Sequence, residues 1–134
     1  MVMVRVYVVT DGVYSDMRIE GASTSLVDAA KIVADKACSD NPLIWAFEGG
    51  DEVEGDGTLY YMVCDLQGGG IATTREGVVD YVPGKVNVPP IVKVLPVAQW
   101  RPLVFVIGSD KGKVAQAFSD TLAAEAIKRG LVIK

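Results

Sequence analysis

The sequence predicts a single α+β domain: a mainly antiparallel sheet with two helices, over about residues 25–39 and 110–129, packed on one face. Short segments rich in β-branched and aromatic residues alternate with turn-forming residues along most of the chain. Two other segments carry apolar residues at helical spacing. A length of 134 residues, with no long linker, suits one hydrophobic core, so residues 1–134 are expected to form one compact domain.

The first part of the chain predicts a strand, a turn, a second strand and a helix. Residues 4–10 and 17–22 have strand-like patterns, and the turn-forming Asp11-Gly12 lies between them. Ser25 and Asp28 have the spacing of a capping box, which predicts that the first helix begins there.

The middle of the chain predicts two hairpins. Residues 43–48 and 58–66 are apolar and aromatic, and the acidic, glycine-rich connection between them favours their pairing. Residues 71–74 and 77–82 are expected to form a shorter hairpin. The proline-rich segment 83–99 predicts either edge strands or an ordered meander against the sheet.

The last part predicts a central strand and a long helix. The continuous apolar run 103–107 is typical of a strand covered on both faces, and Asp110 is the expected helix N-cap. Gly130 is expected to end the helix, and 131–133 to add a short strand. The predicted inward face of the helix consists of Val114, Ala117, Phe118, Thr121 and Leu122.

Composition excludes several classes of function. The chain has no histidine, which removes Ser-His and Cys-His catalysis and the commonest metal ligand. Its net charge is −4 and its basic residues are scattered, so we expect no direct binding of nucleic acid. No apolar run is long enough to cross a bilayer, and the first ten residues read as a strand rather than a signal peptide. We therefore expect a soluble, cytoplasmic protein, with Cys38 and Cys64 as buried thiols.

Two segments resemble ligand-binding loops without meeting their requirements. Residues 52–57 have the alternating carboxylates of a calcium loop, but Val63 stands where a bidentate glutamate is needed. A charged, solvated loop with at most weak Ca²⁺ binding is the favoured interpretation. Residues 108–114 look like a phosphate-binding loop, but the glycines are one residue too close and Val114 replaces the hydroxyl residue that holds Mg²⁺. No metal or cofactor is predicted.

The most distinctive string is Val6-Tyr-Val-Val-Thr-Asp-Gly-Val-Tyr-Ser-Asp-Met-Arg-Ile-Glu-Gly21, followed by Ser23-Thr-Ser25. Over roughly residues 4–38 it resembles small uncharacterised proteins of bacteriophages and bacteria. In those, a strand ending in a Thr-x-Gly-x-Tyr-Ser-Asp turn leads to an Ile-Glu strand and a capped helix. The resemblance implies an origin in a phage or its bacterial host, but no activity.

The candidate interaction surface has two parts, and each has a structural alternative. The turn residues are either a self-bonded polar turn with the tyrosine ring on the sheet edge, or a recognition patch. Trp100 beside Arg101 is either core packing or an interface anchor. The candidate residues are Asp11, Tyr14, Ser15, Asp16, Arg18, Trp100 and Arg101.

Three functions remain open, in descending order. The first is a non-enzymatic phage or prophage accessory protein that binds a host or phage protein and inhibits a host factor. The second is a structural or decoration protein that assembles with copies of itself through a sheet edge or the proline-rich segment. The third is a small enzyme that works without histidine, through carboxylates, tyrosine and lysine.

Overall fold

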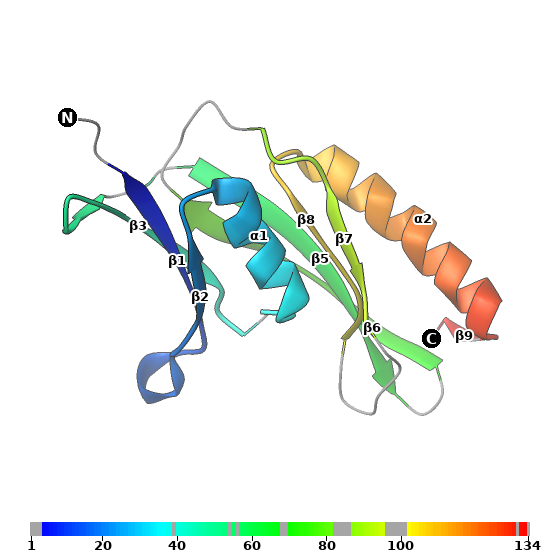
Figure 1. Cartoon of the computed structure of the whole chain (residues 1–134). Coiled ribbons are helices and arrows are strands. Elements are labelled where there is room, and N and C mark those ends of the chain that lie inside the picture. The colour runs from blue at the N-terminus through cyan, green and yellow to red at the C-terminus, as the bar shows by residue number, and fades with distance from the viewer. Residues whose placement is uncertain are drawn as a thin grey trace.

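The described part of the chain folds into two β-sheets and two α-helices (Figure 1). The computed structural model describes residues 4–38, 40–53, 55, 57–67, 70–81, 87–95, 102–130 and 132–133. Sheet A has the strand order β2-β1-β3-β4, and sheet B has the order β7-β8-β5-β6-β9. Every pair is antiparallel except β6 with β9. The predicted α+β class with mainly antiparallel pairing is confirmed, but the strands form two sheets rather than one.

Sheet A is built around β1, which pairs with β2 on one side and β3 on the other. A short 3-10 turn, η1 (Tyr14–Asp16), connects β1 to β2, as the turn prediction for this segment requires. The strands of sheet A are β1 (Arg5–Asp11), β2 (Arg18–Ser23), β3 (Leu43–Glu48) and β4 (Asp51–Val53).

Sheet B contains the longest strands and most of the second half of the chain. Its strands are β5 (Gly57–Gln67), β6 (Gly70–Tyr81), β7 (Ile91–Val94), β8 (Pro102–Gly108) and β9 (Val132–Ile133). Strand β7, which belongs to the proline-rich segment 83–99, lies at the edge of sheet B, as the edge-strand alternative for that segment predicts. The final short strand is also confirmed.

Both predicted hairpins of the middle segment are wrong. The first fails because β3 pairs with β1 and β4, whereas β5 pairs with β6 and β8 in the other sheet. The second fails because residues 70–81 form one strand that follows β5 along its whole length. Arg75, placed by the prediction in a turn, instead forms an ion pair with Asp65 on β5, at 3.1 Å.

The helices begin as their capping residues predict. In α1 (Leu26–Asp35), the Ser25 hydroxyl accepts the Asp28 N–H, and in α2 (Lys111–Arg129), Asp110 accepts the Lys113 N–H. Gly130 ends α2 with φ +63°. Helix α1 ends four residues earlier than expected, because Ala37 adopts φ +50° and the next N–H donates to the Val33 carbonyl.

The helices pack on opposite faces of sheet B, so their predicted placement on one face is wrong. Phe105 and Ile107 of β8 share a core cluster with α1 and sheet A. Val104 and Val106, which point the other way, share a second cluster with α2. The physical reason is that a strand with apolar side chains on both faces must be covered on both. Figure 1 accordingly shows α1 between the sheets and α2 on the far side of sheet B.

Two tyrosines and the two cysteines show how further side chains are placed in the core. Tyr60 and Tyr61 point to opposite faces of β5: Tyr61 is buried against the Phe105 ring and Tyr60 is half-buried. Cys38 and Cys64 are both buried, in different core clusters. Neither helix of the described chain is long and apolar enough to cross a membrane.

Candidate interaction surface

The turn from β1 to β2 depends on a glycine at its first position. Gly12 has φ +100°, and a Cβ there would overlap with the carbonyl oxygen of Asp16. The turn is closed by a hydrogen bond from the Asp16 N–H to the Val13 carbonyl, at 3.0 Å. The close approach of these two backbone segments therefore requires a residue without a side chain.

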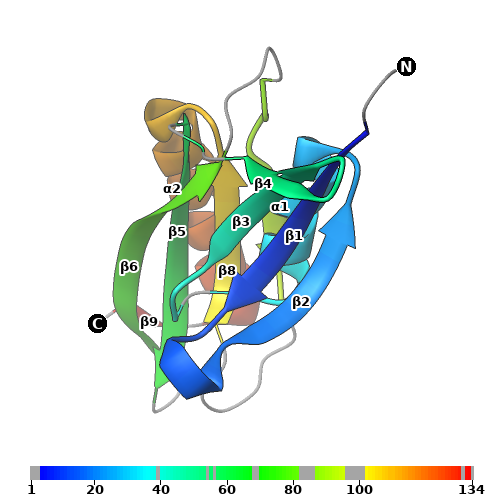
Figure 2. The ribbon, with the colours of Figure 1, turned by 90° about the vertical axis from the view of Figure 1, so that its left-hand side faces the viewer.

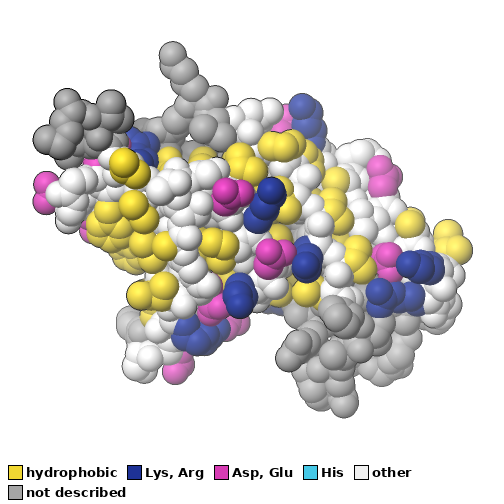
Figure 3. All heavy atoms as spheres, viewed as in Figure 1, with side chains coloured by type: hydrophobic (Ala, Val, Ile, Leu, Met, Phe, Trp, Pro, Cys, Tyr) yellow, Lys and Arg dark blue, Asp and Glu magenta, His cyan; other side chains and the backbone are white. Residues whose placement is uncertain are grey.

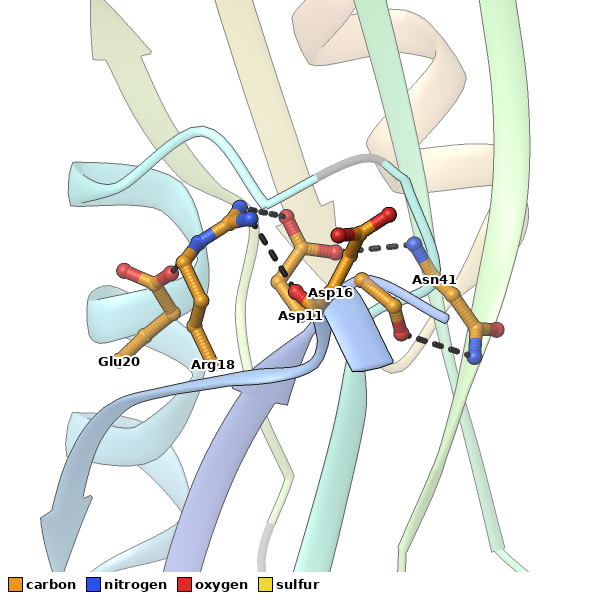
Figure 4. Close-up of polar contacts among 6 residues, drawn as sticks. Asp11, Asp16, Arg18, Glu20 and Asn41 are labelled. Atoms are coloured by element: carbon orange, nitrogen blue, oxygen red, sulfur yellow. Dashed lines mark hydrogen bonds and ion pairs between the residues drawn. The ribbon is translucent and has the colours of Figure 1, made fainter. Parts of the chain in front are cut away.

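Asp11 anchors this turn to the loop that follows α1 (Figure 4). Its side chain is buried and its Oδ1 accepts the backbone N–H of Asn41 at 2.9 Å. The Asn41 side chain returns a hydrogen bond to the Gly12 carbonyl at 3.4 Å. Asp11 thus satisfies a buried donor, and its role is structural rather than that of a surface contact.

Arg18 spans the opening of the turn. Its Nε donates to Glu20 at 3.1 Å, its Nη1 donates to the Asp16 carbonyl at 3.3 Å, and its Nη2 lies 3.9 Å from Asp11 Oδ2. The hydrogen bond with Glu20 is the main cause of a raised pKa for the guanidinium. The side chain is still 57% exposed, so Arg18 remains open to a partner.

The structure thus brings together part of the predicted patch. Asp11, Asp16 and Arg18 are in contact, and Ser15, Asp16 and Arg18 are exposed. Residue Tyr14 begins η1, but its side chain lies outside the described residues, as do Trp100 and Arg101.

A second, larger feature adjoins this turn: the face of sheet A that points away from α1. Tyr7 and Val9 of β1 are buried against the core, so the alternating residues of the strand point outward. The strand registers place outward residues of β2 and β3 directly beside them. This outer face consists of Val6, Val8, Thr10, Ile19, Ala22, Leu43, Trp45 and Phe47.

The outer face is apolar and is not covered by either helix. Ile19 is 76% exposed, and Val6, Val8, Trp45 and Phe47 are each half-buried. Figure 2 shows sheet A toward the viewer with α1 and α2 behind it, and Figure 3 shows apolar side chains gathered at that side of the molecule. An exposed apolar sheet face of this kind is typical of a binding surface.

Trp45 is held in a fixed orientation at the centre of the outer face. It lies opposite Val8 in the strand register, and its Nε1 donates to Thr10 Oγ1 at 2.8 Å. The hydrogen bond satisfies the polar edge of the indole while the rest of the ring remains apolar. A tryptophan oriented before binding loses little conformational freedom when a partner covers it.

The rim of the outer face is acidic. Two rim cations are already paired, Arg5 with Glu48 at 2.6 Å and Arg18 with Glu20. Asp16, Asp51 and Glu52 are exposed, and the structure shows no ion pair for them among the residues it describes. Asp51 pairs with Glu48 on the other face of β4, so in the described part of the chain the unpaired charge beside the outer face is the negative charge of Asp16 and Glu52.

The outer face was not found from the sequence, although a signal for it exists. The run 43–47 is apolar at both odd and even positions, which is typical of a strand covered on both faces. In the structure only one of those faces is covered. Local pattern could not reveal this, because it does not say which sheet a strand joins.

The structure describes residues 108–114 and part of residues 52–57, the two segments that resemble ligand-binding loops. Among the described residues no three His, Cys, Asp or Glu side chains are grouped to hold a metal, and Glu54 and Asp56 of the acidic connection lie outside them. At the start of α2, Asp110 caps the helix and the Ser109 hydroxyl is bonded to the backbone of Val88. These contacts occupy groups that a phosphate would need.

Comparison of the chain with protein-family models, curated proteins and solved structures gave no match. The functional argument therefore depends on the geometry and chemistry of the surface itself.

Proposed function

We propose that this chain is a non-enzymatic interaction module that binds another protein through the outer face of sheet A and the adjoining turn. The observation that carries the proposal is the uncovered apolar face around Trp45, with Ile19 76% exposed beside it. In the folded chain such a face stays in contact with water, and burying it against a partner is favourable.

The sequence adds an origin to this proposal. Its resemblance over residues 4–38 to small phage and bacterial proteins suggests a phage or prophage accessory protein that works in the cytoplasm of a bacterial host. The partner is then a host or phage protein, and covering a functional surface of a host factor would inhibit that factor.

Two isoleucines offer a matched pair of variants to test the surface. Ile19 lies on the outer face, whereas Ile127, 83% exposed, lies on α2 on the far side of sheet B. Ile19→Asn and Ile127→Asn make the same chemical change without altering the net charge. The tagged protein and both variants are used to capture partners from a bacterial lysate, with mass spectrometry, and light scattering measures the stoichiometry of each purified protein.

The proposal predicts one near-stoichiometric partner that is retained by the wild type and by Ile127→Asn but lost by Ile19→Asn. Arg18→Ala tests whether the adjoining turn takes part, because a change in capture in either direction would place Arg18 in the binding surface. A monomer that captures no such partner would overturn the proposal, and capture that survives Ile19→Asn would remove the outer face from it. A closed oligomer of the chain alone, disrupted by Ile19→Asn, would favour the structural alternative instead.

A further inference from the structure

We infer that the outer face of sheet A accepts a basic amphipathic helix of its partner, with the apolar side of the helix on Trp45 and its lysines or arginines at the acidic rim. This inference rests on the proposed function and names the chemistry of the partner. It follows from the dimensions of the face, its apolar centre and the sign of its rim.

The dimensions of the face match one helix. Neighbouring strands lie about 4.8 Å apart and alternate residues about 6.8 Å apart, so the three strands β2, β1 and β3 present an apolar area of about 14 Å by about 20 Å. A helix is about 10–12 Å wide and rises 1.5 Å per residue, so about 13 residues span the long dimension. A standard interface between whole domains takes about 800 Å² from each partner, more than twice this footprint.

The rim selects the charge of that helix. Glu52 lies at the β4 side, where it pairs with Phe47 of the outer face, and Asp16 lies at the turn. Asp51 pairs with Glu48 and therefore points to the other face of sheet A. Basic side chains reaching outward from a docked helix would meet the carboxylates of Glu52 and Asp16 on the two sides. In the described residues the nearby cations Arg5 and Arg18 are already paired with Glu48 and Glu20.

The same rim disfavours a second copy of this chain as the occupant. A two-fold interface places the same patch on both subunits, so it brings two copies of the acidic rim into one interface. Like charges brought together in this way oppose association. A partner that carries positive charge is therefore the favoured occupant of the surface around Trp45.

The test uses two synthetic 14-residue peptides, each held helical by a hydrocarbon staple. Both carry leucines along one side, and the other side carries lysines in one peptide and glutamates in the other. Binding to the full chain is followed by the backbone amide signals in NMR spectra at 50 mM and 500 mM salt. We expect the lysine peptide to bind at least ten times more tightly at low salt, with shifts confined to β1, β2 and β3, and the preference to shrink at high salt.

Matched variants separate the apolar contribution from the charged one. Ile19→Asn should weaken binding of the lysine peptide at least fivefold, whereas Ile127→Asn should change it less than twofold. Glu52→Lys, beside Phe47, should reduce the preference for the lysine peptide more than Asp51→Lys, which changes a side chain on the other face of β4. Circular dichroism of each variant verifies that the fold is retained.

Several results would overturn the inference: equal affinity for the two peptides, no saturable binding of either, shifts outside sheet A, or a dimer of the wild type that buries the outer face. Failure of the inference and failure of the proposed function can be told apart. A captured partner that depends on Ile19, together with equal affinity for the peptides, rejects the basic helix but keeps the interaction module.

Discussion

Gly77 is the position at which the packing of sheet B is most sensitive to one added methyl group. It lies opposite Tyr61 in the register of β5 and β6, and a Cβ at Gly77 would overlap with the Tyr61 ring. The ring cannot move away easily, because it is 9% exposed and stacks on Phe105 with centroids 5.5 Å apart and planes 11° apart. The glycine therefore provides the space that the aromatic pair occupies.

Gly77→Ala should lower the free energy of unfolding. Forcing an extra carbon into a packed core costs about 1–3 kcal/mol, and replacing glycine by alanine in a strand returns about 0.5–1 kcal/mol. The middle of each range gives a net loss of about 1.3 kcal/mol, within limits of about 0 and 2.5 kcal/mol. For a chain of this size, each kcal/mol corresponds to about 3–5 °C in Tm, so the central expectation is a fall in Tm of about 4–6 °C.

Urea denaturation followed by circular dichroism measures this change, with Gly112→Ala as the matched control. A Cβ at Gly112 meets only Asp110 Oδ1 at 3.4 Å, an ordinary contact, and the site is exposed in the first turn of α2. That variant should be as stable as the wild type or up to about 1 kcal/mol more stable.

A double-mutant cycle with Tyr61→Ala provides the decisive comparison. Once the ring is removed, Gly77→Ala should no longer destabilise the protein, so the two changes should couple by 1 kcal/mol or more. If Gly77→Ala costs the same with and without the ring of Tyr61, the explanation by overlap is wrong.

Four further variants, one of them a control, test three other local features. Ala37→Gly should raise the free energy of unfolding by about 0.5–1 kcal/mol, because Ala37 has φ +50°, a conformation that glycine adopts more easily. The control Ala124→Gly, inside α2, should lower the free energy of unfolding by about 1 kcal/mol in the same urea assay. Burial, and secondarily the Asp11 carboxylate, raises the pKa of Cys38 from 9.0 to about 12. As pH rises, the unfolded chain therefore loses the thiol proton before the folded chain does. The free energy of unfolding should fall between pH 9 and pH 12, by up to about 1.4 kcal/mol per pH unit. In urea titrations Cys38→Ala should show a shallower fall, and an identical fall would show that Cys38 is not its cause. Asp11→Ala should cost about 1–3 kcal/mol, because the Asn41 N–H loses its acceptor; an unchanged denaturation midpoint would show that water replaces it.

The features predicted correctly from the sequence are those determined by neighbouring residues. The helix starts at Ser25 and Asp110 were predictable because each cap bonds an N–H only three residues away. The burial of residues 104–107 was predictable because their apolar side chains point to both faces. In each case a short segment contains the whole physical cause.

The features predicted wrongly depend on residues far apart in the chain. Strand β3 was recognised as a strand, but its paired residues in β1 lie 33 to 43 positions earlier, and local pattern does not select between β1 and β5. Asp11 was placed among the candidate surface residues, whereas its side chain is buried, because its acceptor role depends on Asn41 in another loop. To predict the outer face, one would need to know both which strand pairs with β3 and which face of sheet A is covered by α1.

The arrangement of the two sheets separates the residues that stabilise the fold from those proposed to bind. Sheet B is covered by α2 on one face and by α1 and sheet A on the other, so its buried side chains, such as Val63, Phe105 and Val106, are used for packing. Sheet A contributes only Tyr7, Val9 and their inward neighbours to that core. Exposed positions such as Ile19 therefore contribute little to stability, because water already contacts most of the side chain. It follows that substitutions on the outer face can change affinity for a partner without unfolding the domain, whereas substitutions at Gly77 or Tyr61 cannot.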